Sequence, residues 1–288
     1  MKKLNLFLLI LLIISLVSGI LYSNKLNQTV SSNSGGSNQT STVTNNKPST
    51  PTVTKTFSPA TATETTSDNI NIPVLYYHSI NSTVSNEVIL SPDTLRQQLQ
   101  YVKDSGYTTI TMSQFNDYIK GKGKLPKKSI LITFDDGYMD NYANAYPILK
   151  ELNMTATIFV ISSGIDDGYY LSSAQIKEMS DYGIDIESHT VNHVHLNTLS
   201  YQAQVDELTK SKTRLESITG KPVTAIAYPF GDYTADTKKA TKESGYSLGF
   251  TTDTGFDNKQ SDSFTLKRLY ISSAFTFDKF KSRLQSGK

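Results

Sequence analysis

Two adjacent carboxylates follow a short apolar stretch near the middle of this 288-residue chain. Residues 130–132 are Ile-Leu-Ile, and the next five are Thr-Phe-Asp-Asp-Gly, so Asp135 and Asp136 stand at the end of a predicted buried strand. Neighbouring side chains of a strand point in opposite directions, so both carboxylates can face one site only where the strand breaks, as Gly137 permits. Asp is also favoured in turns and at helix N-caps, so the pair alone fits either a turn or a catalytic site.

Two of the four histidines, His189 and His193, follow another predicted strand. On a helical turn this spacing puts both imidazoles on one face, as in many pairs of metal ligands, although such a pair also occurs by chance. Two imidazoles and one carboxylate make a three-ligand site of the catalytic zinc type, and Asp135 and Asp136 are the obvious carboxylates. One carboxylate would bind the metal, and the other would act as general base for water held on it. This arrangement favours hydrolysis of an amide or ester without a covalent intermediate.

The composition narrows the possible functions. The formal net charge is +2 and there is no basic run, so nothing indicates a nucleic acid partner. Cysteine is absent, which excludes disulfides, thiolate metal sites and cysteine nucleophiles, and any metal must be held by His, Asp or Glu. Hydrophobic residues make up 37% and charged residues 19%, low values that indicate a polar low-complexity segment.

Such a segment lies in the N-terminal part of the chain. Residues 1–22 begin with Met-Lys-Lys and are then almost wholly apolar, which is typical of a signal peptide or signal anchor, and a poor cleavage site favours the anchor. Residues 23–69 are rich in Ser, Thr and Asn, and we expect them to form a disordered linker. By the positive-inside rule, the remainder is predicted to be extracytoplasmic, either membrane-anchored or secreted.

From residue 70 to residue 288, predicted strands alternate with helices of about 10–15 residues. This order predicts an α/β fold of about seven parallel strands with helices outside, close in size to a β/α barrel, although periodicity does not separate a barrel from an open doubly wound sheet. The carboxyl ends of such strands meet at one edge. His78, Asp135, His189 and the Tyr-Pro-Phe sequence at 228–230 all follow predicted strands, so we expect them to lie near one another.

Three motifs together resemble those of the polysaccharide deacetylases, the NodB homology domains of carbohydrate esterase family 4. They are Thr-Phe-Asp-Asp-Gly at 133–137, His-Thr-x-x-His at 189–193 and Tyr-Pro-Phe-Gly at 228–231. The resemblance covers residues 70–288. It implies a distorted (β/α) barrel, removal of acetyl groups from N-acetylglucosamine or other acetylated sugars, and a divalent metal ion, most often Zn²⁺.

The resemblance also implies a role for each motif residue. Asp135 would be the general base, and the metal ligands would be Asp136, His189 and His193. The backbone N–H of Phe230 would help to hold the oxyanion, with Pro229 and Tyr228 beside it at the substrate.

The sequence departs from the family pattern in two places. An Arg usually precedes the Pro of the third motif, and here that position belongs to Ala227-Tyr228. The late Leu-x-His of the family, whose His is the general acid, is also missing. We therefore predict that Arg268 takes over as the partner of Asp135.

For the missing acid, we predict that His78 supplies the proton. His78 also fits a structural histidine at the edge of the core. The Val-Leu-Tyr-Tyr-His sequence at 74–78 resembles the first strand of poly-N-acetylglucosamine deacetylases and their relatives, which also lack the late His.

The leading functional prediction is metal-dependent N-deacetylation of N-acetylglucosamine units on peptidoglycan, poly-N-acetylglucosamine or a chitin-like polymer. The alternatives are an O-acetyl esterase, such as an acetylxylan esterase, and a catalytically silent glycan-binding homologue. The candidates for stacking on sugar rings are Tyr76, Tyr77, Tyr169 and Tyr170, although most tyrosines serve in packing.

Overall fold

Seven parallel strands form the central sheet of the protein in a computed structural model that describes residues 65–66 and 70–288. Their spatial order is β11-β10-β9-β8-β7-β2-β12, and β5 (Thr108–Thr109) pairs with the start of β7. The bounds are β2 (Val74–Tyr77), β7 (Ser129–Phe134), β8 (Thr157–Val160), β9 (Asp185–Ser188), β10 (Ala225–Ala227), β11 (Leu248–Phe250) and β12 (Leu269–Tyr270). The predicted parallel α/β fold of the NodB type is confirmed.

The two ends of this sheet meet through one short segment of chain. Phe250 of β11 forms an isolated parallel bridge with Leu266, and the same chain then runs into β12. The Thr251 N–H donates to the Leu266 carbonyl at 2.8 Å, and the Leu266 N–H donates to the Gly249 carbonyl at 2.9 Å. Residues 266–270 therefore join β11 to β2, and Arg268 lies within this join.

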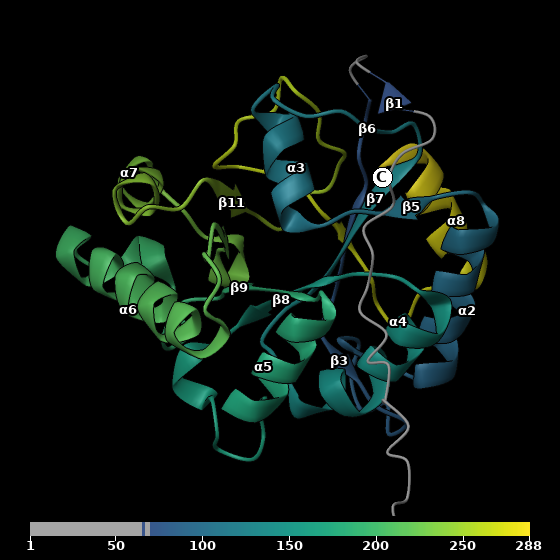
Figure 1. The fold of residues 1–288 in the computed structure, drawn as a ribbon, viewed down its shortest axis with the longest axis horizontal. Coiled ribbons are helices and arrows are strands. Elements are labelled where there is room, and N and C mark those ends of the chain that lie inside the picture. Colours follow the sequence, from purple (N-terminus) through teal and green to yellow (C-terminus); the bar gives the residue numbers. More distant parts are fainter. Residues whose placement is uncertain (1–64, 67–69) are drawn as a thin grey trace, which may run out of the picture. The chain divides into compact units, whose positions relative to one another are not determined.

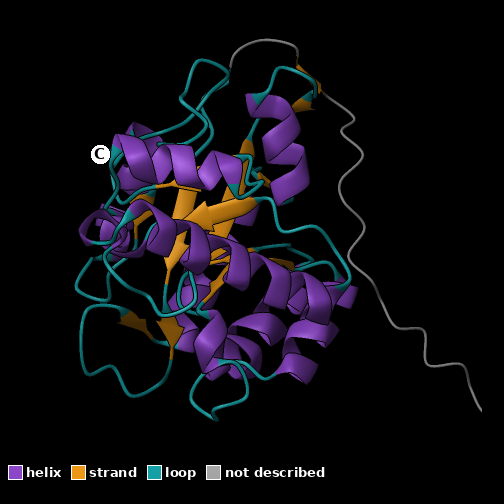
Figure 2. Ribbon diagram, turned by 90° about the vertical axis from the view of Figure 1, so that its left-hand side faces the viewer, coloured by secondary structure: helices purple, strands orange, loops and turns teal. Residues whose placement is uncertain are grey.

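Helices cover the strands on the outside, as Figure 2 shows with helices in purple around strands in orange. Ser91 and Ser172 cap the helices that follow them, Gly183 ends the helix that Ser172 begins, and Gly220 ends the long helix over 201–219. The helices, labelled in Figure 1, are α2 (Pro92–Asp104), α3 (Met112–Ile119), α4 (Tyr146–Leu152), α5 (Ser173–Tyr182), α6 (Tyr201–Thr219), α7 (Ala235–Glu243) and α8 (Phe277–Ser286).

Two local predictions need correction or refinement. The sequence predicts a helix over 113–120 capped by Ser113, but the cap is Thr111, whose hydroxyl accepts from the Gln114 N–H while the Gln114 side chain accepts from the Thr111 N–H. The sequence also predicts a helix over 141–152, and the structure has there a π-helical turn, Asn141–Ala145, followed by α4. Pro147 lies in the first turn of α4, where its missing N–H removes no helical hydrogen bond.

Alternating side chains of the strands build two apolar layers. The inward set, which includes Val74, Leu131 and Phe159, packs against Phe115 of α3, whereas the outward set, which includes Leu75 and Ile132, packs beneath the other helices. The inward positions change character toward the carboxyl ends of the strands. There Leu131 is followed in register by Thr133 and Asp135, so the polar site lies directly beyond the inner apolar layer.

Two further strand pairs lie beside the main sheet. β3 (Ser79–Ile80) pairs in parallel with β4 (Ile89–Leu90) directly after β2. β1 (Thr65–Thr66) pairs with β6 (Leu125–Pro126), although residues 65–66 fall in the predicted linker. The predicted N-terminal signal or anchor lies outside the described residues. Within 65–66 and 70–288, none of the helices combines the length and apolar character needed to cross a bilayer.

A buried carboxylate near the first strand makes stability depend on pH. Asp257 forms an antiparallel bridge with Ile72, and its side chain accepts from the Lys267 N–H at 2.9 Å. Burial, opposed by hydrogen bonds from Ser261 and Lys267, raises the pKa of Asp257 to about 7 from 3.8. Because this pKa is raised by folding, its contribution to stability is complete below about pH 4 and is lost as the pH rises through about 7.

We therefore expect Asp257→Asn to stabilise the protein at about pH 8 but not at about pH 4. The amide keeps an oxygen for the Lys267 N–H and carries no charge. The gain at high pH is at most about 4 kcal/mol, since one pKa unit corresponds to about 1.4 kcal/mol. Denaturant unfolding of both proteins over this pH range measures it, and a pH-independent difference would contradict the assignment.

Candidate active site

Asp135 and Asp136 face one pocket because the backbone turns left-handed directly after the first of them. Asp136 has φ of 72° and Gly137 has φ of 75°, a region that Asp tolerates and that Gly adopts freely. The Ile161 N–H donates to the Asp136 carbonyl at 3.2 Å, and the Leu171 N–H donates to the Gly137 carbonyl at 2.9 Å. The strand breaks at the glycine as the sequence predicted, and neighbouring loops hold it there.

The Asp135 carboxylate is bound in a fork by Arg268. Its two oxygens accept from Nη1 at 2.7 Å and Nη2 at 2.8 Å, while Nε of Arg268 donates to the Thr251 carbonyl at 3.0 Å. The guanidinium also lies 4.1 Å from the centre of the Tyr76 ring. Arg268 is 1% exposed and Asp135 is 3% exposed, so water screens this pair little. The sequence-predicted partnership of these two residues is present in the structure.

The arginine decides the charge of Asp135. Burial opposes ionisation of this carboxyl, but the adjacent Arg268, with a smaller contribution from His189, holds its pKa below the ordinary value. The carboxylate is therefore ionised at neutral pH and can accept a proton.

Asp136, His189 and His193 form a cluster whose ligand atoms all lie within 4.8 Å of one another. Asp136 Oδ1 is 3.4 Å from Nε2 of His189 and 3.5 Å from Nε2 of His193. This oxygen is buried and has no hydrogen-bond partner among the described residues. Ligands about 2.0–2.1 Å from a tetrahedral ion lie roughly 3.4 Å apart, so these three groups fit a divalent cation.

A backbone carbonyl orients one of the two imidazoles. His189 Nδ1 lies 2.7 Å from the Ala227 carbonyl oxygen, a contact that requires the proton on Nδ1. In the neutral ring Nε2 then carries no proton, and it lies 3.4 Å from Asp136 Oδ1. Metal-binding histidines are typically oriented in this way by a second hydrogen bond.

The loop that carries the histidines is not the helical turn that the spacing suggested. Thr190 and His193 have left-handed φ of 67° and 52°, and the loop folds around the Glu207 side chain of α6. This carboxylate accepts from the Val191 and Asn192 N–H groups, both at 2.9 Å. Sequence reasoning missed Glu207, because it lies 14 residues after His193 and no spacing indicates the contact.

The pocket between these groups has a volume of about 260 Å³. Its lining includes His78, Tyr76 and Tyr270, together with Asp135, Asp136 and Arg268. Nδ1 of His78 is buried without a hydrogen-bond partner among the described residues. Burial lowers the pKa of His78, and the charges of Asp135 and Asp136 oppose this effect.

The third motif contributes mostly through its backbone. Tyr228 is fully buried, and its hydroxyl donates to the Phe264 carbonyl at 3.2 Å. Pro229, the next residue, is also buried. Phe230 is 51% exposed, has a left-handed φ of 60° and stacks on His195 at 3.8 Å. Of these three residues, Phe230 alone shows a large part of its side chain to solvent, and its N–H stays the predicted oxyanion donor.

Comparison with known proteins agrees with this geometry. The family model for polysaccharide deacetylases matches residues 122–249. The Bacillus subtilis protein YxkH, whose name assigns it to the polysaccharide deacetylases, is 37% identical over 217 residues, covering 75% of this chain and 77% of its own. The chain belongs to the polysaccharide deacetylase family. It is accordingly a hydrolase of that class.

Two further proteins extend the comparison of this polysaccharide deacetylase. The Streptococcus pyogenes deacetylase PplD, solved with acetate, is 32% identical with a TM-score of 0.71, over 77% of this chain and all of that one. The poly-β-1,6-N-acetyl-D-glucosamine N-deacetylase of Staphylococcus epidermidis is 32% identical over 191 residues, covering 62% of this chain and 66% of its own.

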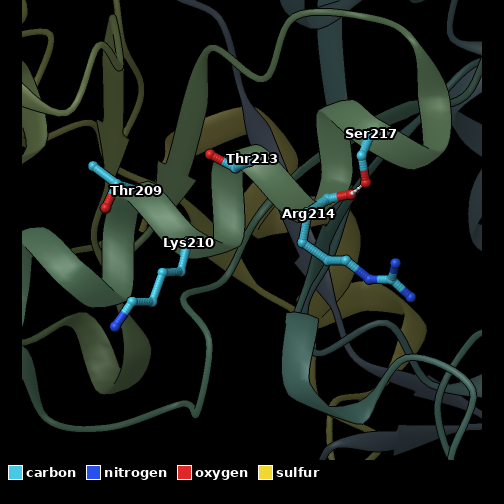
Figure 3. Close-up of a pocket in the computed structure, with 5 residues that line it drawn as sticks. All are labelled: Thr209, Lys210, Thr213, Arg214 and Ser217. Carbon is cyan, nitrogen blue, oxygen red and sulfur yellow. Dashed lines mark hydrogen bonds between the residues drawn. The ribbon is translucent and has the colours of Figure 1, made fainter.

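Another hollow of the deacetylase, of about 410 Å³, is not lined by a set of catalytic groups like that of the motif pocket. Figure 3 shows its five lining residues, all of which belong to α6. Its two cations are paired with carboxylates: Lys210 lies 2.8 Å from Asp206, and Arg214 lies 3.5 Å from Asp166. The titratable groups of the polysaccharide deacetylase motifs lie together in the smaller pocket instead.

We expect Arg268→Met to destabilise the deacetylase by about 3–5 kcal/mol, because it leaves the buried Asp135 charge without a partner. Adding Asp135→Asn should recover most of this loss, because no buried charge then remains. Denaturant unfolding of the two single variants and the double variant measures the coupling. Additive losses in the double variant would show that the two side chains do not stabilise each other.

Proposed function

We propose that this polysaccharide deacetylase hydrolyses the N-acetyl groups of N-acetylglucosamine units on a cell-wall or extracellular polysaccharide. The observation that carries the proposal is the pairing, in one pocket, of a base held ionised by Arg268 with the Asp136–His189–His193 cluster. These three residues would hold a divalent ion, and their nitrogen and carboxylate ligands suit Zn²⁺.

Asp135 is the general base of the proposed reaction. A divalent ion in the cluster would lower the pKa of a nearby water and polarise the acyl oxygen. The Asp135 carboxylate faces the same pocket and takes the proton from the attacking water. The fork of Arg268 fixes the orientation of this carboxylate and keeps it ionised. The Phe230 N–H at the pocket edge would donate to the acyl oxygen as negative charge develops there.

His78 is the proposed proton donor to the leaving amine. It lines the same pocket as Asp135 and the histidine pair. Burial lowers the pKa of His78, and the charges of Asp135 and Asp136 oppose this effect and favour the protonated form that a proton donor needs. An amine leaves poorly without a proton, so the reaction needs a donor at this place.

The names of relatives support N-acetylglucosamine polymers as the substrate. The Staphylococcus epidermidis relative is named for poly-β-1,6-N-acetyl-D-glucosamine. An extracytoplasmic place of action would fit such a substrate. The apolar start at 1–22 and the polar segment at 23–69 support this as an anchor, or a cleaved signal, followed by a linker.

We expect the purified protein to contain about one divalent ion per chain and His193→Ala to lose it, because two ligands hold such an ion poorly. His195→Ala is the matched control, since that imidazole stacks on Phe230 and bonds Asp232 at 2.6 Å outside the cluster. Elemental analysis and acetate release from peptidoglycan, chitin oligomers, poly-N-acetylglucosamine and acetylxylan are measured together. Release from acetylxylan alone would favour an O-acetyl esterase, and glycan binding without any release would favour a silent homologue.

We expect His78→Ala to lower hydrolysis of N-acetylglucosamine substrates by roughly 10²–10⁴-fold, the usual contribution of general acid catalysis. Hydrolysis of 4-nitrophenyl acetate should change little, because that leaving group needs no proton. Initial rates on both substrates, with metal content checked in parallel, separate the two effects. An equal fall on both substrates would mean that His78 does not act as the acid.

A further inference from the structure

Five lysines stand close together in the segment that joins α3 to β7. Residues 120–128 are Lys-Gly-Lys-Gly-Lys-Leu-Pro-Lys-Lys, and no other stretch of the same length in the sequence has as many cationic side chains. We refer to this segment as the lysine loop. It corrects the expectation that the chain has no basic run, which the net charge of +2 concealed because carboxylates elsewhere balance these lysines.

The charges of the lysine loop face solvent and are not neutralised by the protein. All five lysines are exposed, whereas Leu125 between them is buried in the inner apolar layer. Among the described residues, none of the ion pairs involves a lysine of this loop. Lys177 and Lys210, by contrast, each pair with an aspartate four residues away on the same helix. Such an uncompensated cluster attracts anions over about 8–10 Å at ordinary salt concentrations.

The backbone of the lysine loop is held in place. The Lys122 and Gly123 N–H groups donate to the Asp117 carbonyl at 2.8 Å and 3.2 Å. The Ser129 hydroxyl donates to the Pro126 carbonyl at 2.7 Å. The loop therefore presents its charges from an ordered backbone, which reduces the entropy lost when it binds a partner.

The lysine loop and the catalytic pocket lie at opposite ends of β7. This strand begins at Ser129, directly after the loop, and ends at Phe134, directly before Asp135. A strand rises about 3.3 Å per residue, so the loop and the general base are roughly 20 Å apart. None of the loop residues lines the catalytic pocket. The cluster of charge is therefore separate from the proposed chemistry.

The polypeptide that follows the N-terminal segment enters the domain beside the lysine loop. β1 pairs antiparallel with β6, and β6 lies within the loop. The Ile70 N–H donates to the Tyr118 hydroxyl at 2.6 Å, in the last turn of the helix from which the loop continues. An anchor at residues 1–22, as the sequence predicts, would therefore be tethered to the end of the domain that carries these charges.

We propose that the lysine loop docks the domain on a bilayer that contains anionic phospholipids. Lysine ammonium groups are compact point charges without the two-pronged fork of arginine, and their attraction to a layer of phosphate-bearing headgroups adds up over several residues. The apolar side chain of the loop, Leu125, is buried, so docking is electrostatic and inserts nothing into the hydrocarbon. Docking turns the catalytic pocket away from the membrane. The proposal does not rest on the deacetylase function.

The test measures how vesicles protect these lysines from a water-soluble acetylating reagent. The full chain is reconstituted with vesicles of phosphatidylcholine, with or without phosphatidylglycerol, and acetylation of each lysine is followed by mass spectrometry. With phosphatidylglycerol we expect several-fold slower acetylation of Lys120, Lys122 and Lys124. The reference lysines on other helices should react equally in both vesicles: Lys177, Lys210 and Lys279. Salt at about 1 M, where the Debye length is about 3 Å, should abolish the protection.

Two results of this experiment would overturn the proposal. One is equal acetylation of the lysine loop in both kinds of vesicle. The other is protection by soluble polyphosphate without protection by phosphatidylglycerol, which would assign the loop to an anionic polymer instead.

A charge variant tests the same contact with Lys124 as the reporter. Each lysine near an anionic surface changes binding roughly five-fold, so three substitutions should weaken docking about 100-fold and remove the protection of Lys124. These substitutions are Lys120→Gln, Lys122→Gln and Lys127→Gln. The matched control has the same net charge and should keep the protection: Lys177→Gln, Lys210→Gln and Lys279→Gln.

Circular dichroism checks that both variants fold, as expected for exposed positions. Protection of Lys124 that persists in the loop variant, or is lost equally in the control, would contradict docking through this loop. Since acetylation is read without any glycan, the docking proposal and the deacetylase proposal can fail independently.

Discussion

The buried pair between Arg268 and Asp135 is the interaction on which the rest of the site depends. Two charges withdrawn from water are costly, and only a fork of two short hydrogen bonds with further partners offsets this. Arg268 has those partners in the Thr251 carbonyl and the Tyr76 ring. The pair thus ties the base at the end of β7 to the strand segment that joins β11 to β2. One contact thus keeps the base ionised and ties it to the segment whose backbone hydrogen bonds close the sheet.

Backbone strain gathers at the same edge of the sheet. Of the non-glycine residues with left-handed φ among those described, Asp136, Thr190, His193 and Phe230 belong to the three motif loops. Each such residue costs of the order of 1 kcal/mol, and it persists only where surrounding contacts hold it. Here the contacts are visible: Ile161 and Leu171 hold the acidic loop, and Glu207 holds the histidine loop. The strain brings side chains together that regular strands would point apart.

The sequence predicted what periodicity and motif chemistry can carry. The sequence was sufficient to predict the order of strands and helices, most caps, the break at Gly137 and the partnership of Arg268 with Asp135. The last of these came from the family resemblance, because the Arg usual before the third-motif Pro is absent here. The Thr111 cap was missed although it is local, since Gln114 three residues later completes a capping box. The non-helical histidine loop and the Glu207 support were missed because tertiary contacts set them. Short pairs such as β3 and β4 also escaped, since two residues carry no periodicity.

Those unpredicted short strands shape how substrate can reach the site. β3 leaves β2 directly after His78, so the residue proposed as acid belongs to the backbone that continues into β3. Asp140 holds that backbone against the loop that also contains Asp136. A shift of β3 would therefore move the proposed acid and the metal-binding loop together. Coupling of this kind lets contacts with a remote sugar unit improve alignment at the scissile bond, which is how binding energy away from the chemistry can raise kcat as well as affinity.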